Sequence, residues 1–168
     1  IAEWNGLSWQ ALGDGVDGTV TSLAVRANGD LIVGGSITVA GASVVARGVA
    51  RWDGVDWFAI NQGLRTGTTG NDPGSCNALA VLTNGDIVVG GTFDRAGGTN
   101  ALNIARVRFA ADGTSSSWAA YGSGTDGYVE AIEPLPSGAF VAAGTFTTAG
   151  GLAANNIAQW NGSSWSAL

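Results

Sequence analysis

The sequence contains no histidine, no lysine and no methionine, and it has one cysteine among 168 residues. Without histidine, no Ser–His or Cys–His pair can activate a nucleophile, and the commonest metal ligand is missing. Without lysine, there is no Schiff base and no phosphate-loop lysine. Paired carboxylates remain, but Glu3, Glu130 and Glu133 are the only glutamates, and most aspartates stand in turn contexts. We therefore predict that the chain is not an enzyme and has no cofactor.

Positive charge is also scarce. The chain has seven arginines and 13 acidic residues, which gives a formal net charge of −6. Such a surface repels phosphate backbones, so nucleic acid is not an expected partner. No apolar run approaches the roughly 18 residues of a membrane span, and we expect none. The chain has neither a signal peptide nor an initial methionine, so we expect a trimmed product or a segment of a larger protein.

The single cysteine, Cys76, excludes an internal disulfide. We expect a small, partly buried side chain. An intermolecular bridge or a reactive thiol stays open as the alternative.

The abundant residue is glycine, with 28 copies, and it belongs to an internal repeat. One motif appears four times, as "IAEWNGLSW" from Ile1, "VARWDGVDW" from Val49, "IARVRFAADGTSSSW" from Ile104 and "IAQWNGSSW" from Ile157. A second motif runs in phase with it, as "LAVRANGDLIVGGSI" from Leu23, "LAVLTNGDIVVGGTF" from Leu79 and "IEPLPSGAFVAAGTF" from Ile132.

Each motif has the pattern of a β-hairpin. Asn28-Gly29 and Asn84-Gly85 separate short runs rich in Val, Ile and Leu, and Asn-Gly accepts positive φ at both central positions of a tight turn. Asp30 and Asp86 follow these pairs and are interpreted as turn residues. No stretch shows helical periodicity. Two hairpins in about 50 residues predict an all-β fold of propeller-type blades, each with four antiparallel strands.

The repeat sets the domain boundaries. We expect about three and a half blades: an outer hairpin of a preceding or incomplete blade at 1–12, then blades at 13–60, 61–121 and 122–168, with a loop insertion at 64–76. Glycines 34, 35, 90, 91 and 144 would let neighbouring blades approach closely. A structural role, covering the gap between blades, is expected for the seven tryptophans, Trp4, Trp9, Trp52, Trp57, Trp118, Trp160 and Trp165.

These motifs resemble a tandem "WNG" repeat of secreted or surface-attached bacterial proteins, which also occurs in fungal cortical-marker proteins and is related to Kelch and galactose-oxidase central-domain propellers. The clearest segments are "VVGGTFDRAGG" from Val88 and "TFTTAGGLAANNIAQWNGSSWSAL" from Thr145. The third unit departs from the pattern, with Val107 in place of a tryptophan. The resemblance implies a propeller-type fold and an extracellular or cell-envelope location in a bacterium. Such propellers serve many roles, so it implies no single activity.

Two glycine-rich linkers have a loose likeness to calcium or phosphate loops. They are "GDGVDG" from Gly13 and "GSGTDG" from Gly122, and neither fits a full metal-ligand pattern. We interpret both as connections between blades. A weak Ca²⁺ site at Asp14 and Asp17, or at Asp126, is the alternative.

Long, variable loops are predicted on the rim opposite the Asn-Gly turns, and binding sites are common on such loops. The candidate partner-binding residues there are Arg47, Arg65, Asp72, Asp94 and Arg95. Two functions follow. The first is a structural or adhesive module that assembles with further blades of a longer chain or by self-association. The second is a ligand-binding propeller that recognises a glycan or a protein through this rim.

Overall fold

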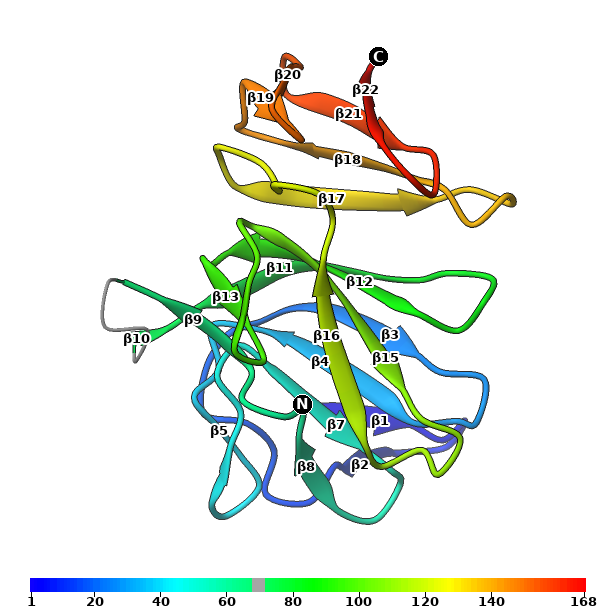
Figure 1. Cartoon of the computed structure of the whole chain (residues 1–168). Helices are drawn as coiled ribbons and strands as arrows, with labels where there is room; N and C mark the ends of the chain where they lie inside the picture. Colours follow the sequence, from blue (N-terminus) through cyan, green and yellow to red (C-terminus); the bar gives the residue numbers. More distant parts are fainter. Residues whose placement is uncertain (68–71) are drawn as a thin grey trace.

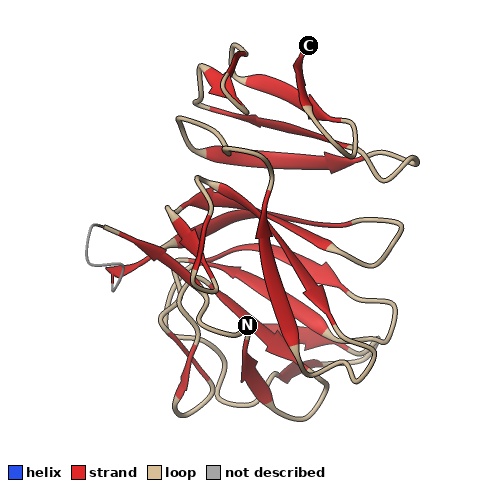
Figure 2. Cartoon of the chain, viewed as in Figure 1, coloured by secondary structure: helices blue, strands red, loops and turns tan. Residues whose placement is uncertain are grey.

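The computed structural model describes residues 1–67 and 72–168, and this part of the chain is all-β, without a helix (Figure 2). The absence of helix was expected from the sequence. Most strands belong to three antiparallel four-stranded sheets. The first sheet contains β3 (Val20–Val25), β4 (Leu31–Gly35), β7 (Val49–Trp52) and β8 (Trp57–Ala59). The second contains β11 (Ser75–Val81), β12 (Ile87–Thr92), β15 (Ile104–Phe109) and β16 (Ser116–Ala120). The third contains β17 (Val129–Pro134), β18 (Phe140–Gly144), β21 (Ile157–Trp160) and β22 (Trp165–Ala167).

Short hairpins complete the fold. The chain begins with a two-stranded unit, β1 (Ala2–Trp4) and β2 (Trp9–Ala11). The connection between the second and third strands of each sheet carries a small hairpin. These are β5 (Val39–Ala40) with β6 (Val44–Val45), β13 (Arg95–Ala96) with β14 (Thr99–Asn100), and β19 (Thr148–Ala149) with β20 (Leu152–Ala153). In the middle repeat, β9 (Leu64–Thr66) and β10 (Asp72–Pro73) extend that hairpin into the order β10-β9-β13-β14.

The Asn-Gly turns differ in detail from the prediction. Positive φ occurs at Gly29 (93°) and Gly85 (81°), but not at the asparagines before them. Gly29 N donates to Arg26 O (2.9 Å) and Arg26 N to Asp30 O (2.8 Å). This is the three-residue loop in which an ordinary turn is followed by one left-handed residue. Only the glycine must therefore accept the unusual backbone conformation.

The three sheets stack face to face, and their first strands lie next to one another (Figure 1). β11 contacts β3 on one side and β17 on the other. One buried cluster joins Ile32 and Val49 of the first sheet to Val89 of the second, and another joins Val88 of the second sheet to Phe140 of the third. The core of the molecule is therefore mostly the contact between successive sheets.

Two glycines permit this contact. A Cβ atom at Gly90 would lie 2.5 Å from Val129 Cγ1 and 2.9 Å from Ile132 Cδ1 of the next sheet, and one at Gly34 would overlap Cys76. The other predicted glycines act differently. Added Cβ atoms at Gly35, Gly91 and Gly144 would collide with backbone of their own sheet, beside its β-bulge. Only part of the expected glycine set therefore serves the contact between sheets.

Trp118 and Trp165 belong to the buried clusters that join successive sheets, and tryptophans also pack on linkers and loops. Trp57 Nε1 donates to Leu12 O (2.9 Å), and Trp165 Nε1 donates to Tyr121 O (3.0 Å). Trp118 is buried in the same repeat position, and Trp52 and Trp160 are half-buried. By contrast, the first two tryptophans, in the hairpin of residues 1–12, are 52% (Trp4) and 68% (Trp9) exposed in the part of the chain that the structure describes. The covering role predicted for these two stays a prediction.

The expected insertion at 64–76 is too long. Leu64 in β9 pairs with Ala96, as Val16 pairs with Ala40 and Thr125 with Ala149, so it belongs to the regular repeat. At the other end, Ser75 and Cys76 already form the start of β11. The extra residues therefore lie between Thr66 and Ser75; part of the predicted insertion, 68–71, is outside the described residues.

The contact between the second and third sheets predicts the effect of Gly90→Ala. The added methyl group has no space beside Val129, so we expect about 1–3 kcal/mol of destabilisation in urea unfolding. Ala143 occupies the equivalent position on the face of the third sheet that no other described sheet contacts, and Ala143→Gly is the matched control. It should cost about 1 kcal/mol or less. Equal costs for the two variants would contradict this account.

Candidate functional site

The structure brings the five predicted rim residues to one corner of the molecule. Arg65, Asp72 and Arg95 are in the small sheet β10-β9-β13-β14, and Asp94 directly precedes β13. Arg47 joins them because its carbonyl accepts from Leu64 N (2.7 Å). A hollow of about 370 Å³ lies there, lined by Gly67, Asp94, Arg95, Asn100 and Leu102.

Backbone contacts account for part of this arrangement. Asp94 N donates to Arg65 O (3.0 Å), and Arg47 has a positive φ of 47° where the chain turns toward Gly48. One carboxylate oxygen of Asp94, Oδ1, is buried without a hydrogen-bond partner within the described ranges. The corner therefore gathers charged groups on a loop scaffold.

The aspartates of the glycine-rich linkers hold loops in place. Asp126 accepts from Thr147 N (2.8 Å), Thr147 Oγ1 (2.6 Å) and Thr148 N (2.7 Å). Asp17 accepts in the same way from the backbone N–H groups of Thr38 and Val39 and from the Thr38 hydroxyl. Both carboxylates thus fasten the linker to the hairpin that follows the second strand. No group of three or more potential metal ligands was found in the part of the chain that the structure describes.

These hydrogen bonds lower the pKa of both carboxyl groups. The Thr147 hydroxyl, with the N–H of Thr148, lowers the pKa of Asp126 to about 2. The Thr38 hydroxyl has the largest part in lowering the pKa of Asp17.

The opposite rim, formed by the hairpin turns, contains ion pairs of two buried aspartates, which the sequence interpretation missed. Asp30 Oδ2 accepts from Arg26 (2.6 Å) and Arg51 (2.9 Å). In the next repeat, Asp86 binds Arg108 through both oxygens (2.6 and 2.7 Å). The two aspartates are therefore ion-pair acceptors inside the fold and not simple turn residues.

Burial alone would raise the pKa of Asp30, but hydrogen bonds from Arg51 and Asn28 outweigh it, so this pKa lies below its ordinary value. At Asp86 the same competition ends in a lowered pKa, because the hydrogen bonds and charge of Arg108 outweigh burial. The sequence contained a signal for part of this arrangement: Asp30 and Asp86 recur in register with Arg51 and Arg106, whereas Asp53 stands at the position of Arg108 in the first repeat.

Cys76 is fully buried, and burial raises the pKa of its thiol to about 12. Its Sγ lies 3.6 Å from Ser22 Oγ of the preceding sheet, and its carbonyl accepts from Thr21 Oγ1 (2.5 Å). The side chain thus belongs to the packing between sheets and is more buried than expected. A buried thiol with a high pKa is a poor nucleophile.

Comparisons with known protein families, with curated proteins and with solved structures find no match for this chain. The residues described in the structure include no helix of the length and apolar character that crossing a membrane requires.

The pKa of Asp126 predicts acid sensitivity of its linker. The folded-state pKa of about 2 is below the reference value of 3.8, so the contact stabilises the fold above about pH 4. This stabilisation is lost as the pH falls through 2. NMR titration of the Asp126 carboxyl group should give a midpoint near 2, and Thr147→Val should move it toward 3.8. A midpoint near 3.8 in the unmodified chain would contradict the hydrogen-bonded geometry.

Proposed function

We propose that this chain is a non-enzymatic structural or adhesive repeat module, built from propeller-type blades, of a secreted or cell-surface bacterial protein. It works by assembly with further sheets of the same type, in a longer chain or in other copies. The equal strand order of the three sheets and the contacts of β11 with β3 and with β17 support a blade arrangement.

One observation carries the proposal: an uncovered apolar strip along β3, at the edge of a first-sheet face whose Val33 and Ala50 are buried. Leu23 is 53% exposed and Val25 is 64% exposed. Their counterparts, Leu79 and Val81 in the second sheet, pack on the cluster that includes Ile32 of the first sheet. The repeat itself thus indicates what belongs on this face, which is another sheet of the same kind.

The open face of the third sheet is more polar. Glu133 stands where the first two sheets have Ala24 and Ala80, and Gln159 stands where they have Arg51 and Arg106. Glu133 is exposed. Apolar burial is the main driving force of association, so the first-sheet face is the stronger candidate interface.

The alternative function, recognition of a glycan or protein by the long-loop rim, is supported by the convergence of Arg47, Arg65, Asp72, Asp94 and Arg95 at one corner. Recognition by this rim requires a separate ligand, whereas assembly requires only another sheet of the same repeat. A glycan-binding screen separates the two, since a pure scaffold should give no signal.

We predict that the isolated chain self-associates at micromolar concentration through the first-sheet face. Light scattering should give about twice the mass of one chain or more. Leu23→Glu combined with Val25→Glu should shift the chain to the monomer, because it places charge on the contact surface. Val55→Glu, at an exposed turn residue, is the matched control and should leave the mass unchanged. A monodisperse monomer with a cooperative melt would contradict the proposal.

A further inference from the structure

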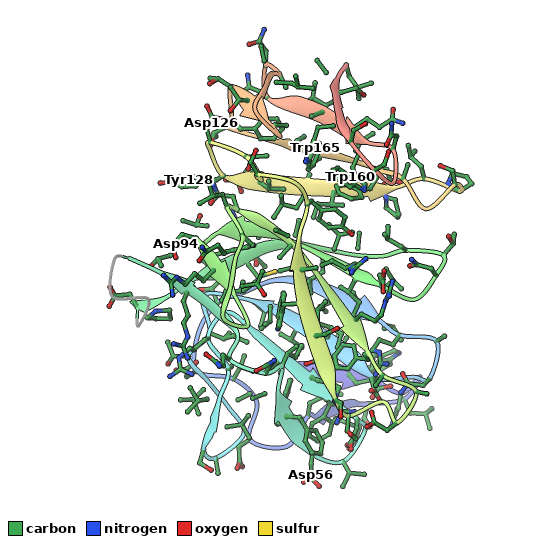
Figure 3. The ribbon with its side chains drawn as sticks, viewed as in Figure 1. Asp56, Asp94, Asp126, Tyr128, Trp160 and Trp165 are labelled. Atoms are coloured by element: carbon green, nitrogen blue, oxygen red, sulfur yellow. The ribbon has the colours of Figure 1, made fainter. Side chains whose placement is uncertain are left out.

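A pocket of about 360 Å³ lies between the second and third sheets, on the rim of hairpin turns. The second sheet and its linker contribute Asn84, Asp86, Arg106 and Tyr121, and the third contributes Ser137 and Trp160. In Figure 3, Trp160 is at the turn end of the third sheet. The pocket is on the rim opposite the predicted loop site, so it is a separate feature of the molecule.

Tyr121 has a hydroxyl that packing does not require. Gly124 N donates to Tyr121 O (3.1 Å), just as Gly15 N donates to Leu12 O (3.0 Å) and Gly63 N to Ile60 O (3.0 Å). Three repeats therefore share this position, and two of them fill it with an aliphatic side chain. The Tyr121 ring packs edge-on against Phe140 (4.8 Å) and Trp160 (5.2 Å).

The Tyr121 hydroxyl is buried and has no hydrogen-bond partner among the described residues. Leaving a buried hydroxyl without a partner costs stability, and aliphatic residues at the same position avoid that cost. Tyr121 and Arg106 both line this pocket. A ligand held there would have a phenolic hydroxyl and a guanidinium beside it as hydrogen-bond donors.

The ion pairs leave positive charge in excess here. Asp86 receives two hydrogen bonds from Arg108 and one from Asn84 (3.0 Å). Arg106 is 3.7 Å from Asp86 Oδ2, too far for a close hydrogen bond, and its side chain is 36% exposed. Arg106 thus supplies a cation whose donors are not used by the carboxylate. Since the whole chain has a net charge of −6, a singly charged anion suits the pocket better than a polyanion.

We propose that this pocket binds a small ring that bears one carboxylate, as in a uronic-acid sugar. The carboxylate accepts hydrogen bonds from Arg106 and from the Tyr121 hydroxyl, and arginine suits the planar carboxylate. The apolar face of the ring lies against Trp160, and the exposed Ser137 hydroxyl is at hand for a ring hydroxyl. The other junctions do not offer this combination, because Leu12 and Ile60 replace the tyrosine.

The test is NMR titration of the tryptophan indole N–H signals with methyl glucuronide, methyl glucoside and benzoate. The glucuronide should shift the Trp160 signal saturably, with a Kd of about 1–10 mM. The neutral glucoside should bind at least about tenfold more weakly, because it lacks the carboxylate. Benzoate distinguishes a sugar carboxylate from an aromatic carboxylate. If benzoate binds and the glucuronide does not, the pocket takes a carboxylate-bearing ring that is aromatic and not a sugar.

Variants assign the contacts. Tyr121→Phe keeps the ring and removes the hydroxyl, so glucuronide affinity should fall about tenfold while the melting temperature stays the same or rises. Arg106→Gln should also weaken binding about tenfold or more, and Arg95→Gln on the opposite rim should not change it. Absence of a saturable shift with either carboxylate, or unchanged affinity in folded Tyr121→Phe, would overturn the proposal.

Discussion

The close approach of successive sheets is the constraint on which the rest of the structure depends. A four-stranded sheet with two apolar faces needs a neighbour on each side, and here the neighbours are other copies of the same repeat. Gly34 and Gly90 lack a side chain where Cys76 and Val129 of the next sheet enter. The linkers before the first and third sheets are held in the same way, since Leu12 O and Tyr121 O accept from the Trp57 and Trp165 indoles.

The same constraint separates the two kinds of surface. Where a neighbour is present, as between the second and third sheets, the turn rim holds the buried Asp86 with its arginine partners and leaves a small pocket. Where no neighbour is present, Leu23, Val25, Trp4 and Trp9 are exposed. Assembly and ligand recognition are therefore proposed at different places in the fold, and each can be tested without disturbing the other.

Much of the architecture was predictable from the sequence because the repeat aligns its own copies. The all-β class, the antiparallel strand pairs and the position of the long loops follow from apolar alternation and turn residues. The details that failed depend on three-dimensional partners. Asn28 has no positive φ because the ladder continues from Arg26 to Asp30, and Gly35 serves its own sheet because a bulge lies beside it.

The candidate sites were harder to predict for the same reason. Burial of Asp86 depends on Arg108, 22 residues away on another strand, and the Tyr121 hydroxyl is conspicuous only once its neighbours are known to lack a partner for it. A comparison of equivalent positions could have indicated part of this: Asp30 and Asp86 recur with Arg51 and Arg106, and tyrosine replaces an aliphatic residue in one repeat alone, whereas Arg108 has no equivalent. The exposure of Trp4 and Trp9 could not be inferred from the repeat. A recurring residue indicates the surroundings that its position has in most repeats, and it does not indicate that the neighbouring strands are lacking in one of them.

The most direct test of the account is a double-mutant cycle between Gly90 and Val129, measured by urea unfolding. Each single variant, Gly90→Ala and Val129→Ala, should destabilise the chain, the first by overlap and the second by loss of buried volume. If the two residues meet between the sheets, the double variant should be more stable than the sum of the single effects by about 1 kcal/mol or more, because the truncated valine makes room for the new methyl group. Strict additivity would contradict the face-to-face packing on which the whole account depends.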